Sequence, residues 1–229
     1  MKRVICALLL LAFLSPALAS AADNTMKDAT PASHVALLYE KLTNKTGKMP
    51  DFTKWVKDWS KYKKADFMER QKLMDETVKS LENTYNLLTW AEPIVVKTKV
   101  KISAYSHLGK GFLVQNFNDI TFFRFYHMGR GYALIPSGMA NYQWLKAPPG
   151  MADLVMRETK NGHEAIVSIT MTSMKADPTP MPMGKRHYRL LMAEVSKIEL
   201  WSQDRKNIIW DDQIGAQDRT RKKLLNLRQ

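Results

Sequence analysis

The residue types that most often carry catalysis are sparse in this sequence of 229 residues. It contains no Gly-x-Ser-x-Gly, no His-Glu-x-x-His, no phosphate loop and no Gly-x-Gly-x-x-Gly pattern, which are the spacings that position a nucleophile, a zinc ion or a phosphate group. His163 and Glu164 lack the second histidine of a zinc protease, and Ser137 lacks the flanking glycines of a nucleophile elbow. The sequence therefore predicts no catalytic residue.

Metal and cofactor ligands are equally scattered. The single cysteine, Cys6, lies in an apolar run near the start of the chain, and the five histidines are His34, His107, His127, His163 and His187. Isolated histidines are explained most simply by hydrogen bonding at turns or in the core, because a metal site needs several ligands that converge. We expect no metal site and no cofactor from these residues.

Methionine offers one alternative to that expectation. The chain has 14 methionines, and Met171, Met174, Met181 and Met183 occur close to His187. Thioether and imidazole groups together are soft ligands that suit Cu(I). Strand alternation places Met171 and Met174 on opposite faces, however, and methionine is also an adaptable filler of cores. The sequence leaves copper binding open, and packing is the favoured interpretation.

A segment that combines aromatic residues with lysines offers binding chemistry instead. If residues from 51 onward form a helix, the aromatic side chains share one face and lysines lie opposite. The residues of this candidate binding surface are Trp55, Lys57, Trp59, Lys61, Tyr62 and Lys64. Such an interfacial helix binds anionic lipid or lipopolysaccharide through aromatic burial and lysine charge together. The alternative is that the aromatic stripe packs on a sheet and the lysines form a solvated face.

The elements that carry these residues divide the chain near residue 93. Residues 23–92 are predicted to be helical, with one helix from Ser33 as N-cap to residue 47, a second from Asp51, and a third that begins at the capping box of Asp66 and Glu69. In the third helix apolar residues recur at the spacing of a core-facing helix. They are Phe67, Met74, Val78, Leu81, Tyr85 and Leu88.

Residues 93–215 are predicted to be rich in β-strands. Apolar residues alternate with lysines over residues 96–104, which is typical of a half-buried strand with a lysine-studded outer face. Further strands are predicted at 112–117, 121–126, 132–135, 165–174, 188–201 and 207–211, the last two as a hairpin. A short helix is predicted at 151–158, and an exposed loop at 177–184, which holds three prolines.

These expectations define an α+β fold: an N-terminal helical segment is followed by a mainly antiparallel β-sheet with one short inserted helix. Residues 216–229 form a basic C-terminal tail. The size and apolar content suit one globular domain, or at most two small ones.

The first residues predict export. Lys2 and Arg3 precede an apolar run over residues 4–14 and a small-residue segment over residues 17–22, the order of a Sec-type signal peptide. Cleavage after Ala19 and cleavage after Ala22 both follow small residues, so the two sites stay open. We expect residues 1–22 to be a signal peptide and the mature protein to be periplasmic or secreted.

The charge of the chain points to an anionic partner. Lys2 and Arg3 are the only charged residues of the leader, so 33 of the 35 basic residues remain against 22 acidic ones, a formal net charge of +11. For an exported protein we expect no nucleic acid but an anionic envelope surface, a polymer or a protein partner, with peripheral membrane contact as one mode. The alternative is a basic surface that only keeps the protein in solution. Neither reading predicts an oligomeric state.

Four short motifs follow one another along the mature chain. They are Lys64-Ala65-Asp66-Phe67, Ala104-Tyr105 with Gly111-Phe112, Ala152-Asp153-Leu154-Val155, and the closing hairpin over residues 195–210. In this order of features the chain resembles an uncharacterised family of exported proteobacterial proteins defined only as a domain of unknown function. The resemblance implies an envelope location and no particular activity.

From the sequence we predict an exported, non-enzymatic binding or assembly component of the bacterial cell envelope. The alternative is a hydrolytic enzyme that acts on an envelope polymer through an unrecognised site. The two differ in what a structure should show. An enzyme needs convergent His, Asp, Glu or Ser side chains in one cleft, whereas a binding protein needs a contiguous apolar or basic patch.

Overall fold

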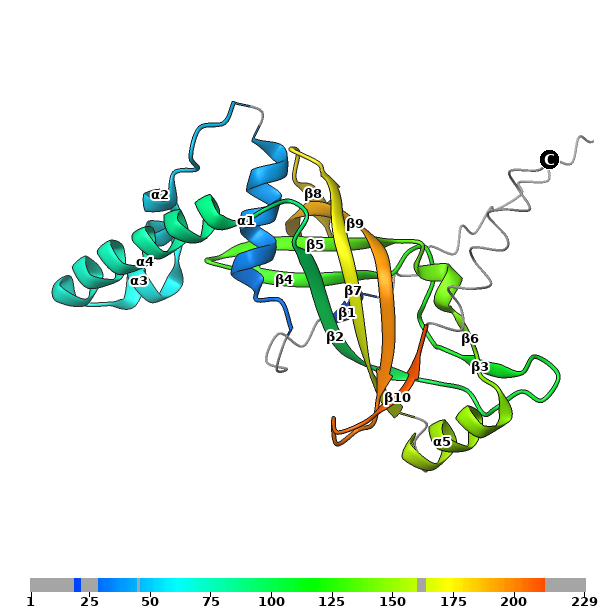
Figure 1. The fold of residues 1–229 in the computed structure, drawn as a ribbon. Helices are drawn as coiled ribbons and strands as arrows, with labels where there is room; N and C mark the ends of the chain where they lie inside the picture. The colour runs from blue at the N-terminus through cyan, green and yellow to red at the C-terminus, as the bar shows by residue number, and fades with distance from the viewer. Residues whose placement is uncertain (1–18, 22–28, 45, 160–163, 213–229) are drawn as a thin grey trace, which may run out of the picture.

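A computed structural model describes residues 19–21, 29–44, 46–159 and 164–212 of the chain. It confirms the α+β fold, because N-terminal helices precede a large, mainly antiparallel sheet and a short helix is inserted between strands (Figure 1). The helices are α1 (Ala32–Thr43), α2 (Phe52–Asp58), α3 (Ser60–Lys64), α4 (Phe67–Leu87), the 3-10 helix η1 (Met139–Tyr142) and α5 (Pro149–Thr159).

The main sheet is organised around its longest strand, β9 (Arg186–Trp201). The strand order is β1-β4-β5-β9-β7-β2, and β8 and β10 also pair with β9. β5 runs parallel to β9 and β1 parallel to β4, while the other pairs are antiparallel. The remaining strands are β1 (Ala19–Ala21), β2 (Pro93–Lys101), β4 (Phe122–His127), β5 (Arg130–Ser137), β7 (Glu164–Ala176), β8 (Met181–Met183) and β10 (Ile208–Asp211), and a small second sheet joins β3 (Gly111–Leu113) to β6 (Trp144–Lys146).

Most of the predicted strands are confirmed, and two parts of the prediction are wrong. Residues 177–184 are not only a loop, because β8 pairs with β9 across a turn in which Gly184 has a φ of 64°. Prolines fit this short strand because not every backbone N–H in it has to donate. The strand predicted at 112–117 ends at Leu113, and Asn116 has a left-handed φ of 68°, which a regular strand does not accommodate.

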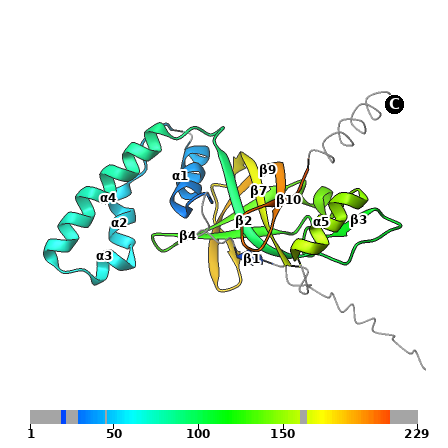
Figure 2. The same ribbon diagram turned by 60° about the horizontal axis from the view of Figure 1, so that its bottom comes forward.

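Helix α1 lies between the sheet and the other N-terminal helices (Figures 1 and 2). Five consecutive residues from Val35 to Tyr39 are buried, so the helix is enclosed on most of its circumference rather than on one stripe. It begins after Pro31, which occupies the N-cap position, and not at Ser33 as predicted. The proline ring holds φ at −63°, which suits a helix start, and no side chain caps α1 there.

Helices α2, α3 and α4 form a helical arm that projects to one side of the sheet (Figures 1 and 2). Asp66 caps α4 as predicted, since its carboxylate accepts a hydrogen bond from the backbone N–H of Glu69 at 2.9 Å. Helix α4 packs along α2 and α3. Of its 21 residues only Leu81 and Tyr85 are buried, because the arm is a single thin layer of helices.

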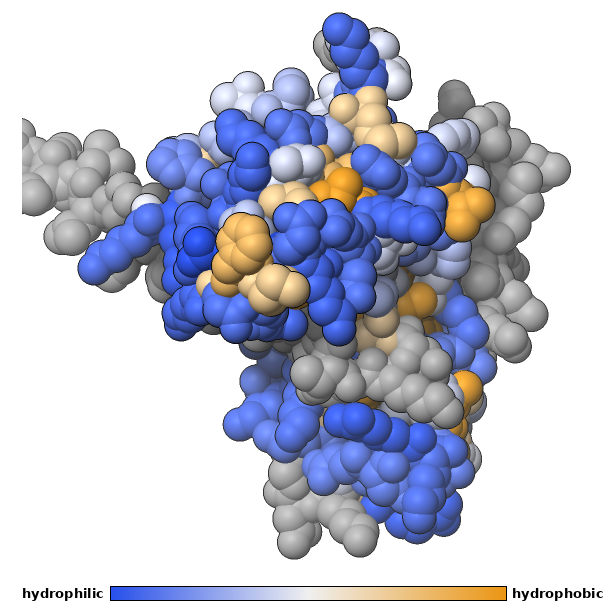
Figure 3. All heavy atoms as spheres, turned by 90° about the vertical axis from the view of Figure 1, so that its left-hand side faces the viewer, coloured by the Kyte–Doolittle hydropathy of each residue, from blue (hydrophilic) through white to orange (hydrophobic). Residues whose placement is uncertain are grey.

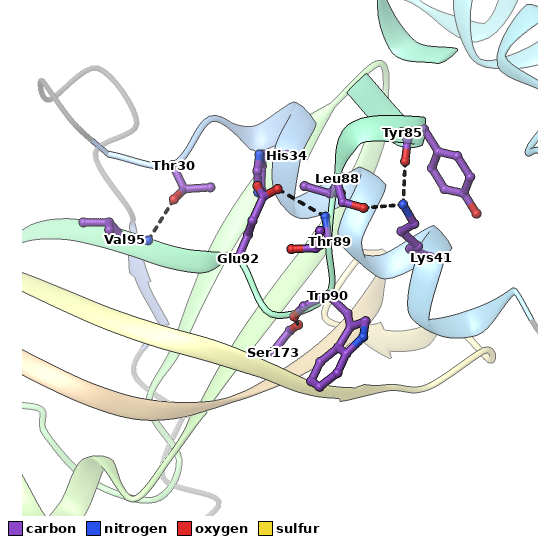
Figure 4. Close-up of polar contacts among 10 residues, drawn as sticks. All are labelled: Thr30, His34, Lys41, Tyr85, Leu88, Thr89, Trp90, Glu92, Val95 and Ser173. Atoms are coloured by element: carbon purple, nitrogen blue, oxygen red, sulfur yellow. Dashed lines mark hydrogen bonds and ion pairs between the residues drawn. The ribbon is translucent and has the colours of Figure 1, made fainter. Parts of the chain in front are cut away.

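Polar contacts hold the base of the arm against the rest of the protein (Figure 4). The Lys41 ammonium of α1 donates to the backbone carbonyls of Tyr85, at 2.7 Å, and of Leu88. These carbonyls end α4, where a cation is favourable. On the far side of the connection to β2, the Ser173 hydroxyl of β7 donates to the Trp90 carbonyl at 2.5 Å. The arm is therefore anchored to both α1 and the sheet.

The predicted signal peptide and basic tail fall largely outside the described residues. Of residues 1–22 the structure describes only β1, which pairs in parallel with β4 from Phe122 to Arg124. Cleavage after Ala22 would remove this strand, and cleavage after Ala19 would remove its first residue. The predicted tail, residues 216–229, lies entirely outside the described part of the chain.

Candidate functional site

The aromatic residues of the predicted binding surface pack inward. Trp55 is 2% exposed; its ring meets Phe52 edge-on at 5.2 Å and His127 at 5.9 Å, and the Arg130 guanidinium lies over it at 4.6 Å. Trp55 therefore belongs to the contact between the arm and β4 and β5, and its ring is not available at the surface. For Trp55 the alternative interpretation holds, in which the aromatic stripe packs on the sheet.

Trp59 and Tyr62 are half-buried against the same core. Cations cover part of what remains exposed: the Lys61 ammonium lies over the Trp59 ring at 5.5 Å, and the Arg70 guanidinium lies over Tyr62 at 5.8 Å. Arg70 also donates to the backbone carbonyls of Tyr62 and Lys63, at 3.2 and 3.0 Å. These contacts join α3 to the first turn of α4.

The predicted continuous helix is broken at Trp59, which has an extended backbone with φ −69° and ψ 131°. The break lets the Trp59 ring pack on the core while α3 starts in a new direction. A helical wheel drawn through residues 52–64 therefore does not describe which side chains share a face. Lys57, Lys61 and Lys64 are nevertheless exposed, as predicted.

The exposed apolar side chains at the end of the arm are not those of the predicted binding surface. One was predicted to lie in the core, and the other was assigned neither to the core nor to the binding surface. Phe67 and Met68, the first two residues of α4, are 80% and 76% exposed. Phe67 had been placed on the buried stripe of α4 by its seven-residue spacing to Met74, and that placement is wrong. The first turn of α4 extends past the residues that could cover it.

Basic residues are frequent in the sequence on both sides of these two residues. From residue 60 to 72 the basic residues are Lys61, Lys63, Lys64, Arg70 and Lys72, against the acidic Asp66 and Glu69, and all seven are exposed. We call residues 60–72 the arm tip. Figure 3 views the arm end-on and shows a small apolar island within a hydrophilic surface. The lysines of α3 stand in its last turn, where the helix dipole also favours cations.

The described residues do not bring together the side chains that usually bind a metal ion. Within residues 29–44, 46–159 and 164–212, no group of three or more His, Cys, Asp or Glu side chains is placed to hold a metal ion. Met171 is fully buried and Met174 is 52% exposed, which is the opposite-face arrangement expected from strand alternation. His163 lies outside the described residues.

Two of the described histidines are shifted toward the neutral form. Burial and, to a smaller extent, the neighbouring Arg130 lower the pKa of His127 to about 4. Burial also lowers the pKa of His34, although Glu92, whose carboxylate lies 3.2 Å from the His34 ring, opposes the shift. His127 packs against the Trp55 ring and His34 pairs with Glu92, so the two histidines have different surroundings.

No helix among the described residues is long and apolar enough to cross a membrane. Comparison with models of known protein families, with curated proteins and with solved structures finds no match for this chain. The resemblance drawn from the sequence therefore stays a prediction, and the function has to be inferred from the chain's own residues.

Proposed function

We propose that the protein is an exported, non-enzymatic binding component of the bacterial cell envelope, and that its arm tip makes peripheral contact with an anionic lipid surface. The observation that carries this proposal is the exposure of Phe67 and Met68 at the end of a projecting arm. Large apolar side chains in isolation are common on surfaces, but an adjacent pair that follows three exposed lysines in the sequence combines both interactions that an interfacial element needs.

The arm tip is distinguished from other exposed apolar positions by its charge. Leu87 and Trp90, at the other end of α4, are 80% and 64% exposed, yet residues 86–92 contain no basic residue and include Glu92. Charge complementarity to anionic lipid therefore favours the tip over the base. The arm also points away from the sheet (Figures 1 and 2), so the tip can reach a flat surface before the sheet does.

The expected energies are sufficient for reversible binding. Moving a large apolar side chain out of water is worth about 1.5 to 3 kcal/mol when burial is complete. Each lysine near an anionic surface contributes about 1 kcal/mol, so Lys61, Lys63 and Lys64 together change the partition coefficient by about two decades. Salt weakens the lysine contribution, because exposed charges are screened over about 8 Å at physiological ionic strength.

Co-sedimentation with vesicles tests this proposal. We expect the protein to bind vesicles that contain phosphatidylglycerol and not neutral phosphatidylcholine vesicles. In a Lys61/Lys63/Lys64→Gln variant the partition coefficient at low salt should fall by about two decades. High salt screens the lysines, so the binding that remains there should depend on Phe67 and Met68 and should be absent in a Phe67→Ser/Met68→Ser variant.

The matched control replaces three exposed lysines on the sheet, Lys99, Lys101 and Lys175, with glutamine. It removes the same net charge from a different face and should leave most of the binding intact. Equal loss in both lysine variants would mean that net charge alone drives binding, and absence of binding to either vesicle would remove the membrane proposal. In either case a protein partner becomes the better explanation of the exposed tip.

A further inference from the structure

An open cleft of about 490 Å³ lies at the base of the arm, between α1, α2, strands β5 and β9, and the loop before β8. Its volume is in the range of small-molecule sites. The polar side chains that line it include Tyr39 and Glu40 from α1, Lys54 from α2, Arg130 from β5 and Arg189 from β9, and Pro178 and Pro180 form part of its rim. This cleft is separate from the arm tip.

The two arginines of the cleft keep much of their donor capacity. Arg130 is largely buried, with 17% of its side chain exposed; it lies over the Trp55 ring and forms one long ion pair, at 3.7 Å, with the half-exposed Asp58. Arg189 lies over the Tyr132 ring at 5.7 Å, and no described residue forms a hydrogen bond or an ion pair with its guanidinium. An aromatic ring occupies the face of a guanidinium and leaves the N–H edge able to bind a carboxylate or a phosphate.

The acidic side chains that line the cleft do not form ion pairs with these arginines. Neither arginine comes within ion-pair distance of Glu40, although both act on it: burial raises the pKa of Glu40, and Arg130 and Arg189 oppose that shift. The other carboxylate of the lining, Asp51, caps α2 by accepting from the backbone N–H of Lys54 at 2.9 Å. The lining therefore holds three cations and two carboxylates, and Asp58, which pairs with Arg130, lies outside the lining.

A buried hydroxyl lies beneath two of the residues that line the cleft. Tyr132 is fully buried, and its hydroxyl has no hydrogen-bond partner in the described part of the chain. Buried hydroxyl groups without a partner are costly and rare in folded proteins. The Arg189 guanidinium lies over the Tyr132 ring at 5.7 Å, and the Tyr39 ring meets it at 5.7 Å. Two residues that line the cleft therefore contact Tyr132, although Tyr132 itself does not line it.

We infer that the cleft binds a small ligand through an oxyanion, a carboxylate or a phosphate, that is held between Arg130 and Arg189 with Lys54 at the rim. Glu40 accepts a hydrogen bond from a donor group on the same ligand, and the prolines and Tyr39 contact its apolar part. The inference does not depend on the membrane proposal, because no residue of the arm tip lines the cleft.

Titration of the purified protein with inorganic phosphate and with acetate, at constant ionic strength, tests this site by NMR. The indole N–H of Trp55, assigned by a Trp55→Phe variant, reports on the cleft because Arg130 lies over its ring. We expect a saturable shift with at least one probe. Saturation by phosphate alone assigns a phosphorylated ligand, and saturation by acetate as well assigns a carboxylate.

Variants locate the binding. Arg189→Gln should weaken the apparent affinity by about tenfold, the value of one charge-assisted hydrogen-bond set. Lys54→Gln should also weaken binding. Because the Lys54 side chain is exposed, this variant should stay folded and can test the site even if Arg189→Gln unfolds. Arg186→Gln, three residues earlier on β9 and on its opposite face, is the control and should bind as the wild type does. No saturable shift with either probe, or equal weakening by Arg186→Gln, would overturn the inference.

Discussion

The packing of the arm can be tested at Leu81, which is 6% exposed in the middle of α4. It lies one turn before Tyr85, on the face of α4 that meets α2, where the Tyr85 and Phe52 rings are 5.8 Å apart. Leu81→Ala removes buried methyl groups and leaves a cavity, which costs about 2 to 5 kcal/mol in well-packed cores. Because the arm is one layer thick and can relax around the gap, we expect the lower half of that range.

Urea unfolding followed by circular dichroism and by tryptophan fluorescence measures this loss. Leu87→Ala is a matched control, since it makes the same chemical change in the same helix at a residue that is 80% exposed; it should cost less than about 0.5 kcal/mol. If the two variants lose the same free energy of unfolding, or if Leu81→Ala costs less than about 0.5 kcal/mol, Leu81 does not pack as described. Transitions that differ between the two probes would show that the arm unfolds separately from the sheet.

Two further predictions concern the buried histidine and export. The pKa of His127 in the folded protein is about 4, below the usual value for histidine. As pH falls, the unfolded chain therefore binds a proton at this side chain before the folded protein does. The free energy of unfolding should fall by about 2 to 3 kcal/mol between pH values of about 6.5 and about 4. His127→Gln should flatten this interval and the exposed His107→Gln should not; a wild-type curve without the slope would refute the assigned burial. Expressed in a Gram-negative host, the protein should be recovered from the periplasm with Ser20 or Asp23 as its first residue, and N-terminal sequencing that finds Met1 in the cytoplasm would contradict the predicted signal peptide.

The sequence predicted those features that depend on neighbouring residues. The alternation of valines and lysines in β2 reports which face of the strand is buried, and the structure shows Val96 and Val100 inside with Lys99 and Lys101 outside. The Asp66 cap was predictable because it needs only a side chain and a backbone N–H three residues away. Both features depend only on residues that are close in the chain, so the sequence pattern is enough to predict them.

The candidate site was predicted only in part. The lysines of α3 were placed correctly on the surface because a flexible charged side chain reaches water in almost any arrangement. The aromatic half of the prediction failed at Trp55 because one helix was assumed where the backbone turns at Trp59, and Phe67 was assigned to the core because spacing shows which face a residue is on but not whether another element covers that face.

The sequence by itself therefore determined the α+β class, the order of the long helices and of most strands, and the basic character of the chain, since composition, periodicity and capping act locally. Only the tertiary structure decided that Phe67 and Met68 are exposed at the end of an arm, and that Arg130 and Arg189 face Glu40 across one cleft. Glu40 and Arg189 are far apart in the chain, and they line one cleft because α1 packs over the sheet in which β5 runs parallel to β9. Contacts of this kind depend on long-range packing, for which a single sequence has no local signal.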